Sequence, residues 1–98
     1  MFLGIYRFEG NADKLLPAYD KLVKMIPPGN LHLQVCVSDE KGISIYDACP
    51  SREIFEAFSS SQELQTALQG AGLPQPEVSQ LGEVHSAFLA GKRAIPAE

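Results

Sequence analysis

Residues 31–48, LHLQVCVSDEKGISIYDA, alternate aliphatic side chains with less apolar ones along almost their whole length. An alternation with a period of two is typical of a β-strand that buries one face. Polar residues in the middle of the stretch interrupt the alternation, so the segment predicts two antiparallel strands joined by a short loop. Any fold for this chain must therefore accommodate a β-hairpin with two different faces.

The hydrophobic pattern also predicts the register of this hairpin. A three-residue loop, residues 40–42, with Gly42 in the left-handed position pairs Val37 with Ile45 and keeps the aliphatic side chains together. One face then carries Leu31, Leu33, Val35, Val37, Ile43 and Ile45. The opposite face carries His32, Gln34, Cys36, Ser44, Tyr46 and Ala48.

In this register the two cysteines are too far apart to pair. Cys49 lies opposite Leu33 and points away from Cys36, at a separation of about 10 Å that no disulfide spans. We therefore expect two free thiols, which serve either as small buried apolar side chains or, in the alternative, as a reactive nucleophile.

The first part of the chain supplies a strand and a helix before the hairpin. A run of β-prone residues opens the chain and stops at Glu9-Gly10. Asn11 is a suitable N-cap for an amphipathic helix that ends at PPGN, residues 27–30. Pro17 either lies in the first turns of this helix or kinks it.

After the hairpin the chain supplies a second helical region and a last strand. Ser51 caps this region, which restarts where Ser60 and Glu63 have capping-box spacing. The last strand, EVSQLGEVHSAFL, begins at Glu77, and residues 89–98 form a C-terminal tail without periodicity.

The predicted order of elements is βαββαβ, which indicates an α+β fold of the ferredoxin-like type: a four-stranded antiparallel sheet with the helices on one face. The other sheet face stays uncovered, and we expect it to be the one with His32, Gln34, Cys36 and Tyr46. This face is too apolar for water, so a second copy of the chain is expected to pack against it around a cavity between the sheets.

Length and charge agree with one small domain over residues 1–98. A chain this short buries only roughly 60–65% of the surface that its unfolded form exposes, so packing against a second subunit would add to its stability. The net charge of −4 disfavours nucleic acid as a partner. The sequence contains no spanning apolar run, no signal peptide and no nucleotide or metal motif, so we expect a cytoplasmic protein without membrane contact, cofactor or metal.

Three segments, YDACPSREIFEAFSSSQELQTAL, GLPQPEV and EVHSAF, resemble the dimeric α+β barrel proteins. This superfamily includes antibiotic-biosynthesis monooxygenases and muconolactone isomerases, and the resemblance covers the chain from Phe2 to about Phe88. Proteins of this type often carry a tryptophan and an acidic residue before the Ser-initiated helix, where this chain has Cys49 and Pro50. The resemblance implies a homodimer and a ligand cavity rather than one reaction.

His85 and His32 are the candidate acid-base residues, and Tyr46 is a candidate hydrogen-bond donor to a ligand. Each could instead serve only packing or local hydrogen bonds in an interface. Asp47 is expected to cap a turn at the strand end. The remaining candidate ligand-binding residues are Gln34, Cys36, Glu83, which would orient His85, and either Tyr6 or Arg7, which point to opposite faces.

These observations leave two hypotheses of function. In the first, the protein binds a small aromatic or polyketide-like molecule, as a cofactor-free monooxygenase or isomerase. In the second, it is a non-catalytic dimeric accessory or ligand-binding protein whose interface is filled by side chains. An arginine in the cavity would indicate an anionic ligand, and a tyrosine an aromatic one.

Overall fold

The structure is a computed structural model that describes residues 1–29 and 31–95. Its elements follow the chain in this order: β1 (Phe2–Glu9), α1 (Ala12–Met25), β2 (Leu33–Asp39), β3 (Gly42–Cys49), α2 (Arg52–Ser59), α3 (Gln62–Ala71), β4 (Glu77–Glu83), β5 (Ala87–Leu89) and β6 (Lys92–Ile95). None of the helices in these residues is long and apolar enough to cross a membrane.

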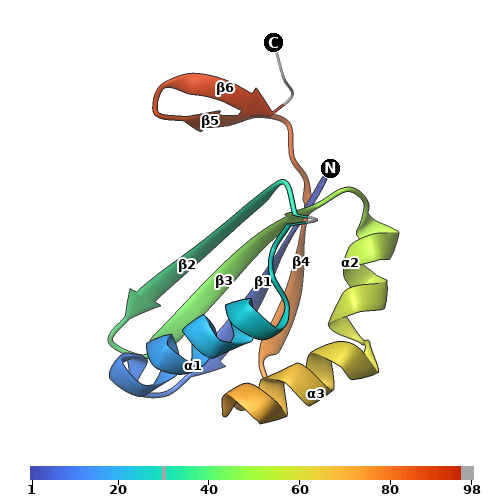
Figure 1. The fold of residues 1–98 in the computed structure, drawn as a ribbon. Coiled ribbons are helices and arrows are strands. Elements are labelled where there is room, and N and C mark those ends of the chain that lie inside the picture. Colours follow the sequence, from blue (N-terminus) through green and yellow to red (C-terminus); the bar gives the residue numbers. More distant parts are fainter. Residues whose placement is uncertain (30, 96–98) are drawn as a thin grey trace.

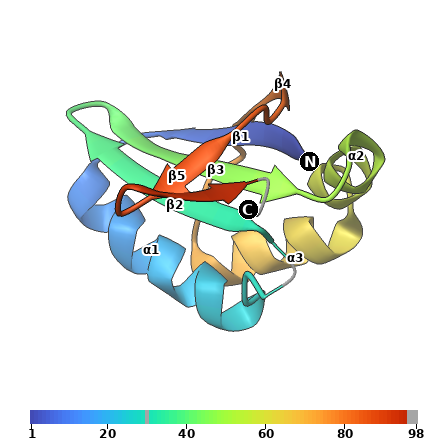
Figure 2. The ribbon, with the colours of Figure 1, turned by 90° about the horizontal axis from the view of Figure 1, so that it is seen from above.

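Four strands form one antiparallel sheet with the order β2-β3-β1-β4. The helices lie on one side of this sheet, and no helix or strand of the described residues covers the other side (Figures 1 and 2). The predicted α+β class with a four-stranded antiparallel sheet is confirmed. The second helical region consists of two separate helices, α2 and α3.

Side chains at the helix starts explain where the helices begin. Asn11 Oδ1 accepts a hydrogen bond from the Asp13 amide at 2.9 Å, and Ser51 Oγ accepts one from the Ile54 amide at 3.2 Å. These two predicted caps are confirmed. The predicted cap of α3 is wrong by one residue, because Ser61 Oγ, not Ser60, accepts from the Leu64 amide.

Pro17 lies inside α1, which already begins at Ala12. Proline at this position removes one amide donor from the helix. The packing of the apolar side of α1 compensates for this loss, since Leu15 and Ala18 are buried on either side of the proline.

The predicted hairpin register is wrong by one residue. Val37 lies opposite Ser44 and Cys36 opposite Ile45, because the loop between β2 and β3 contains only Glu40 and Lys41. Asp39 Oδ1 stabilises this tight loop by accepting a hydrogen bond from the Lys41 amide at 2.8 Å. Local turn chemistry thus outweighs the segregation of aliphatic side chains on which the prediction rested.

The new register exchanges the two faces of β2. The covered face carries Gln34 and Cys36 beside the buried Ile43 and Ile45 of β3. The uncovered face carries Leu33, Val35 and Val37 beside Ser44, Tyr46 and Ala48. The expectation that Gln34 and Cys36 lie on the uncovered face is therefore wrong.

The core lies between the covered sheet face and the helices. Its largest fully buried side chains are Phe8, Ile43, Phe55 and Leu68, from β1, β3, α2 and α3. Gly4 of β1 lets the ring of Phe55 approach the sheet, because a β-carbon at Gly4 would overlap that ring. This close contact anchors α2 on the central strand.

The C-terminal part of the chain differs from the prediction. The last strand of the sheet ends at Glu83, and residues 87–95 form a separate two-stranded hairpin of β5 and β6 that projects from the sheet (Figure 1). The expectation of an unstructured tail is wrong for residues 92–95, and its last part, residues 96–98, lies outside the described residues. Phe88 and Leu89 of this hairpin are exposed.

Candidate functional site

A cavity of about 210 Å³ lies between the helices and the covered face of the sheet. Its walls are mostly apolar and come from β1, β3 and all three helices: Phe8, Leu22, Ile45, Phe58, Leu64 and Leu68. Pro27, Pro50 and Ile54 also line the cavity and are exposed, so the cavity opens to solvent between the end of α1 and the start of α2.

A chain of hydrogen bonds crosses the sheet side of this cavity. The Tyr19 hydroxyl of α1 donates to Gln34 Oε1 at 2.6 Å, and Gln34 Nε2 donates to Asp47 Oδ1 at 3.1 Å. Gln34 and Asp47 are direct partners across β2 and β3, which places both side chains on the same face. The amide of Gln34 thereby orients the carboxyl group of Asp47.

Asp47 is the one charged residue of the buried core among the described residues, with 4% of its surface exposed. Burial raises the pKa of its carboxyl group to about 6, although the hydrogen bond from Gln34 acts in the opposite direction. A carboxyl group with this pKa exchanges protons near neutral pH, which makes it a candidate for ligand binding or acid-base chemistry.

Tyr6 of β1 places a second polar group in the cavity lining. The residue is 5% exposed, and its hydroxyl group is buried without a hydrogen-bond partner among the described residues. Burial raises the pKa of Tyr6 well above its usual range, and the negative charge of Asp47 adds to this effect. An unsatisfied buried hydroxyl is costly, so this group lowers the stability of the fold unless a hydrogen-bond partner reaches it.

The two cysteines are free thiols, as predicted. Both lie on the covered side of the sheet, Cys49 in the core and Cys36 packed against it. Burial raises the pKa of each thiol above its ordinary value. The negative charge of Asp20 adds to this effect at Cys36, and that of Asp47 adds to it at Cys49. These surroundings favour the neutral thiol over a reactive thiolate.

Two of the predicted ligand-binding residues, Tyr6 and Gln34, line this cavity. Cys36 packs against the core beside it. The three come together on the covered face, under the helices, rather than on the uncovered face where the sequence pattern placed Gln34 and Cys36. Of the alternating pair Tyr6 and Arg7, the tyrosine points into the cavity.

The other predicted residues do not line the cavity. His32 is exposed before β2, and His85 is exposed between β4 and β5. Tyr46 is half-buried on the uncovered face, opposite Val35. Glu83 contacts the amino group of Met1 at 3.1 Å, and no hydrogen bond joins it to His85 in the described part of the chain.

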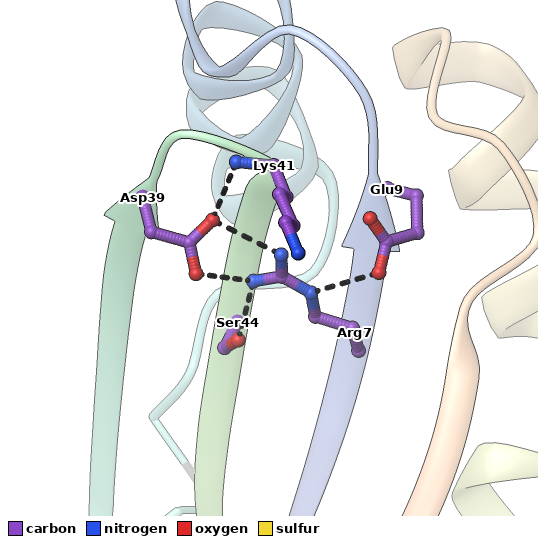
Figure 3. Close-up of polar contacts among 5 residues, drawn as sticks. All are labelled: Arg7, Glu9, Asp39, Lys41 and Ser44. Atoms are coloured by element: carbon purple, nitrogen blue, oxygen red, sulfur yellow. Dashed lines mark hydrogen bonds and ion pairs between the residues drawn. The ribbon is translucent and has the colours of Figure 1, made fainter.

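Arg7 lies on the uncovered face inside a network of polar contacts (Figure 3). Its guanidinium group donates to both carboxylate oxygens of Asp39, at 3.1 and 3.0 Å, and to Ser44 Oγ at 3.0 Å. Glu9 accepts a further, longer contact at 3.4 Å. Since two carboxylates already neutralise its charge, Arg7 is not a free anion-binding group.

The uncovered face also exposes aliphatic side chains. Val35 and Val37 of β2 are 41% and 46% exposed. Leu3, Ile5 and Leu33 are partly exposed near them. This combination of apolar residues and a satisfied ionic network is typical of a surface that contacts another protein.

The described residues do not bring three histidine, cysteine, aspartate or glutamate side chains together in a metal-binding arrangement. The cavity residues can instead hold a small organic molecule, with apolar walls for its body and Asp47, Gln34 and Tyr6 for its polar groups.

Comparisons with known proteins returned no match: no family model, no curated protein and no solved structure matches this chain. The site must therefore be interpreted from its own geometry.

Two residues of the site, Asp47 and Tyr19, were not predicted as functional. Asp47 shares the parity of the buried Ile43 and Ile45, and a carboxylate in such a series is unusual enough to have indicated a buried acid. Tyr19 gives no such signal, because a tyrosine in the apolar stripe of a helix is ordinary packing.

Proposed function

We propose that this protein binds a small, predominantly apolar molecule with an aromatic ring in the cavity between the helices and the sheet. The observation that carries this proposal is a buried carboxyl group in an apolar cavity. Among the described residues Asp47 accepts one hydrogen bond, and the buried hydroxyl group of Tyr6, another lining residue, has no partner. A folded chain that keeps such groups without full hydrogen bonding leaves free energy available for a ligand.

The size of the cavity limits the ligand. A dry cavity of about 150 Å³ lined by leucine, isoleucine and phenylalanine holds benzene. A cavity of about 210 Å³ is therefore suited to a single ring with a short substituent. It is too small for a fused polycyclic molecule unless the helices move apart.

An NMR titration with 2-phenylethanol tests the proposal. We expect amide shifts at Gln34, Asp47 and Tyr19, and their loss in Leu22→Trp, which fills the cavity from α1. Leu81→Trp is the matched control, because Leu81 is exposed on β4 and its variant should keep the shifts. Shifts confined to the uncovered face, or identical titrations of the two variants, would refute the proposal.

We further propose that the chain is a ferredoxin-like dimeric α+β barrel in which two sheets pack through their uncovered faces. The exposed Val35 and Val37 support this arrangement, as does the small core that a chain of 98 residues can bury alone. The cavity with Asp47 lies within one chain, so ligand binding there does not require the partner. A further cavity between the two sheets stays a prediction.

Sedimentation velocity at micromolar concentration tests the dimer. We expect a dimer for the wild type and a monomer for Val37→Lys, which places a charge in the proposed interface. Thr66→Lys on the exposed side of α3 is the control and should stay dimeric. A monomeric wild-type protein at this concentration would remove the dimer from the proposal and leave the cavity unaffected.

A second candidate function is proton transfer on the bound molecule, as in a cofactor-free isomerase or monooxygenase. The pKa of Asp47 near 6 favours this candidate, since a general base works best near the ambient pH. For an uncharged candidate substrate, this candidate function requires that Asp47→Asn abolishes turnover and keeps binding. The predicted catalytic residues do not line this cavity: His85, His32 and Tyr46 all lie outside it.

A further inference from the structure

The cavity contains a negative charge without a counter-ion. Asp47 is the one ionised side chain in its lining at neutral pH, and no lysine, arginine or histidine among the described residues contributes to it. The remaining positions, 30 and 96–98, carry no basic side chain in the sequence. The ion pairs found in the described chain involve Arg7, Arg52 and the amino group of Met1, all away from Asp47.

The surroundings of Asp47 favour a cation over water or an anion. A buried carboxylate can accept several hydrogen bonds, and among the described residues Asp47 accepts one, from Gln34. Tyr6, Tyr19 and Phe58 line the same cavity with aromatic rings, whose faces attract cations. The net charge of −4 on the whole chain adds a long-range field of the same sign.

We infer that the cavity recognises an organic ammonium ion, in which an aromatic or other apolar body carries one protonated amine that pairs with Asp47. This inference rests on the proposed function and specifies the class of ligand for that site. The ammonium group has three N–H donors. One or two of these donors can pair with the carboxylate of Asp47.

The neighbouring titratable groups do not change this charge balance. Burial and nearby acids raise the pKa of four neighbouring groups and so keep them neutral. These groups are Tyr6 on β1, Tyr19 on α1, Cys36 on β2 and Cys49 on β3. A bound ammonium ion therefore meets one negative charge. Its affinity falls as the pH drops and Asp47 takes up a proton.

Isothermal titration with three probes of similar shape tests the inference: 2-phenylethylamine, 2-phenylethanol and phenylacetate. At neutral pH and low salt we expect the amine to bind roughly ten- to a hundredfold more tightly than the alcohol, the range of a hydrogen bond between charged groups. Phenylacetate should bind most weakly. Asp47→Asn should reduce the affinity for the amine to that for the alcohol, whereas Asp39→Asn, on the uncovered face, should change neither.

The outcomes separate the inference from the proposed function. If the alcohol binds as tightly as the amine, or if Asp47→Asn keeps the preference, the ammonium assignment is wrong and the cavity still binds small molecules. If none of the three probes binds, the proposed function fails with it. A carbon-detected NMR titration of wild-type Asp47 avoids any folding defect of the variant: 2-phenylethylamine should lower its midpoint by about one pH unit or more, and an unchanged midpoint overturns the inference.

Discussion

The two faces of the sheet differ in the burial and the hydrogen bonding of their polar side chains. On the covered face, within residues 1–29 and 31–95, Asp47 is buried with one hydrogen bond and Tyr6 has a hydroxyl group without a partner. On the uncovered face, Arg7 and Asp39 form a paired and solvent-accessible network. Exposed polar groups can form hydrogen bonds at little cost in free energy, so their pairing says little about function. Polar groups that stay without full hydrogen bonding under the helices mark the candidate site.

Apolar side chains show the reverse distribution. The covered face buries Ile43 and Ile45 almost completely, while the uncovered face exposes Val35 and Val37 to water. Burial stabilises the single chain in the first case, and in the second the same stabilisation remains available to a partner. In our proposals the covered face therefore binds the ligand, and the uncovered face contacts a second copy of the chain.

The largest expected difference between the faces concerns two isoleucines on neighbouring strands. Ile45→Ala on the covered face should lower the free energy of unfolding by about 2–5 kcal/mol, because the truncation enlarges a cavity in a packed core. Ile5→Ala on the uncovered face should cost about 1 kcal/mol or less, because Ile5 is only half-buried.

Urea denaturation at low protein concentration measures both values. Equal losses for the two variants would mean that the uncovered face is as well packed as the core in solution. That result would contradict the contrast within the single chain and would favour a stable dimer.

The second prediction is a pH dependence that originates at Asp47. Burial raises its pKa from 3.8 to about 6 in the folded state. Between these values the folded chain keeps a proton that the unfolded chain has released, so stability falls as the pH rises through this window, by about 3 kcal/mol. Asp47→Asn should remove this loss and make the variant more stable than the wild type at neutral pH.

Chemical denaturation at the two ends of this pH window, compared between wild type and Asp47→Asn, measures the effect. The other acidic groups titrate equally in both proteins and cancel in the difference. A variant that is less stable than the wild type at neutral pH would show that the carboxylate is well compensated, against the reasoning for an open cation site.

How much of this arrangement was predictable depends on the range of the interactions involved. The strand-helix-hairpin order and the caps at Asn11 and Ser51 follow from local patterns, and they are correct. The hairpin register is not, because the alternation of aliphatic residues in β2 was taken to mark the covered face. Since β2 is an edge strand only partly covered by α1, its valines can stay outside while Gln34 bonds to Tyr19.

The candidate site was predictable only in part for the same reason. Gln34, and Tyr6 as the alternative to Arg7, were predicted as ligand-binding residues of a cavity between two sheets, and the wrong register placed Gln34 on the opposite face from Asp47. That Gln34 and Asp47 are partners across two strands can be predicted only when the register is known. No local signal reports the contact with α1, which depends on the packing of the whole chain.

The third prediction compares two tyrosines of the cavity lining. Tyr19→Phe should lower the free energy of unfolding by about 1 kcal/mol, because it removes the 2.6 Å hydrogen bond to Gln34. Tyr6→Phe removes a buried hydroxyl group without a partner and should leave stability unchanged or raise it by about 1 kcal/mol. Thermal or urea denaturation of the two variants, which lose the same atom, gives the comparison directly. A loss for Tyr6→Phe as large as that for Tyr19→Phe would indicate that the Tyr6 hydroxyl is already satisfied by bound water.

The smallest effect is expected from the ionic network on the uncovered face. The hydrogen bond from Arg7 holds the pKa of Asp39 below its usual value, so this pair stabilises the fold above that value and the contribution is lost as the pH falls through the lowered pKa. The dependence on pH thus has the opposite sign to that of Asp47. Asp39→Asn should destabilise the chain less than Tyr19→Phe does, and added salt should reduce the difference further because both groups are accessible to solvent. Denaturation at low and high salt measures this, with Ser44→Ala as the control that keeps both charges. An effect that exceeds that of Tyr19→Phe and does not respond to salt would mean that the network is shielded from water, as it would be between two sheets packed face to face.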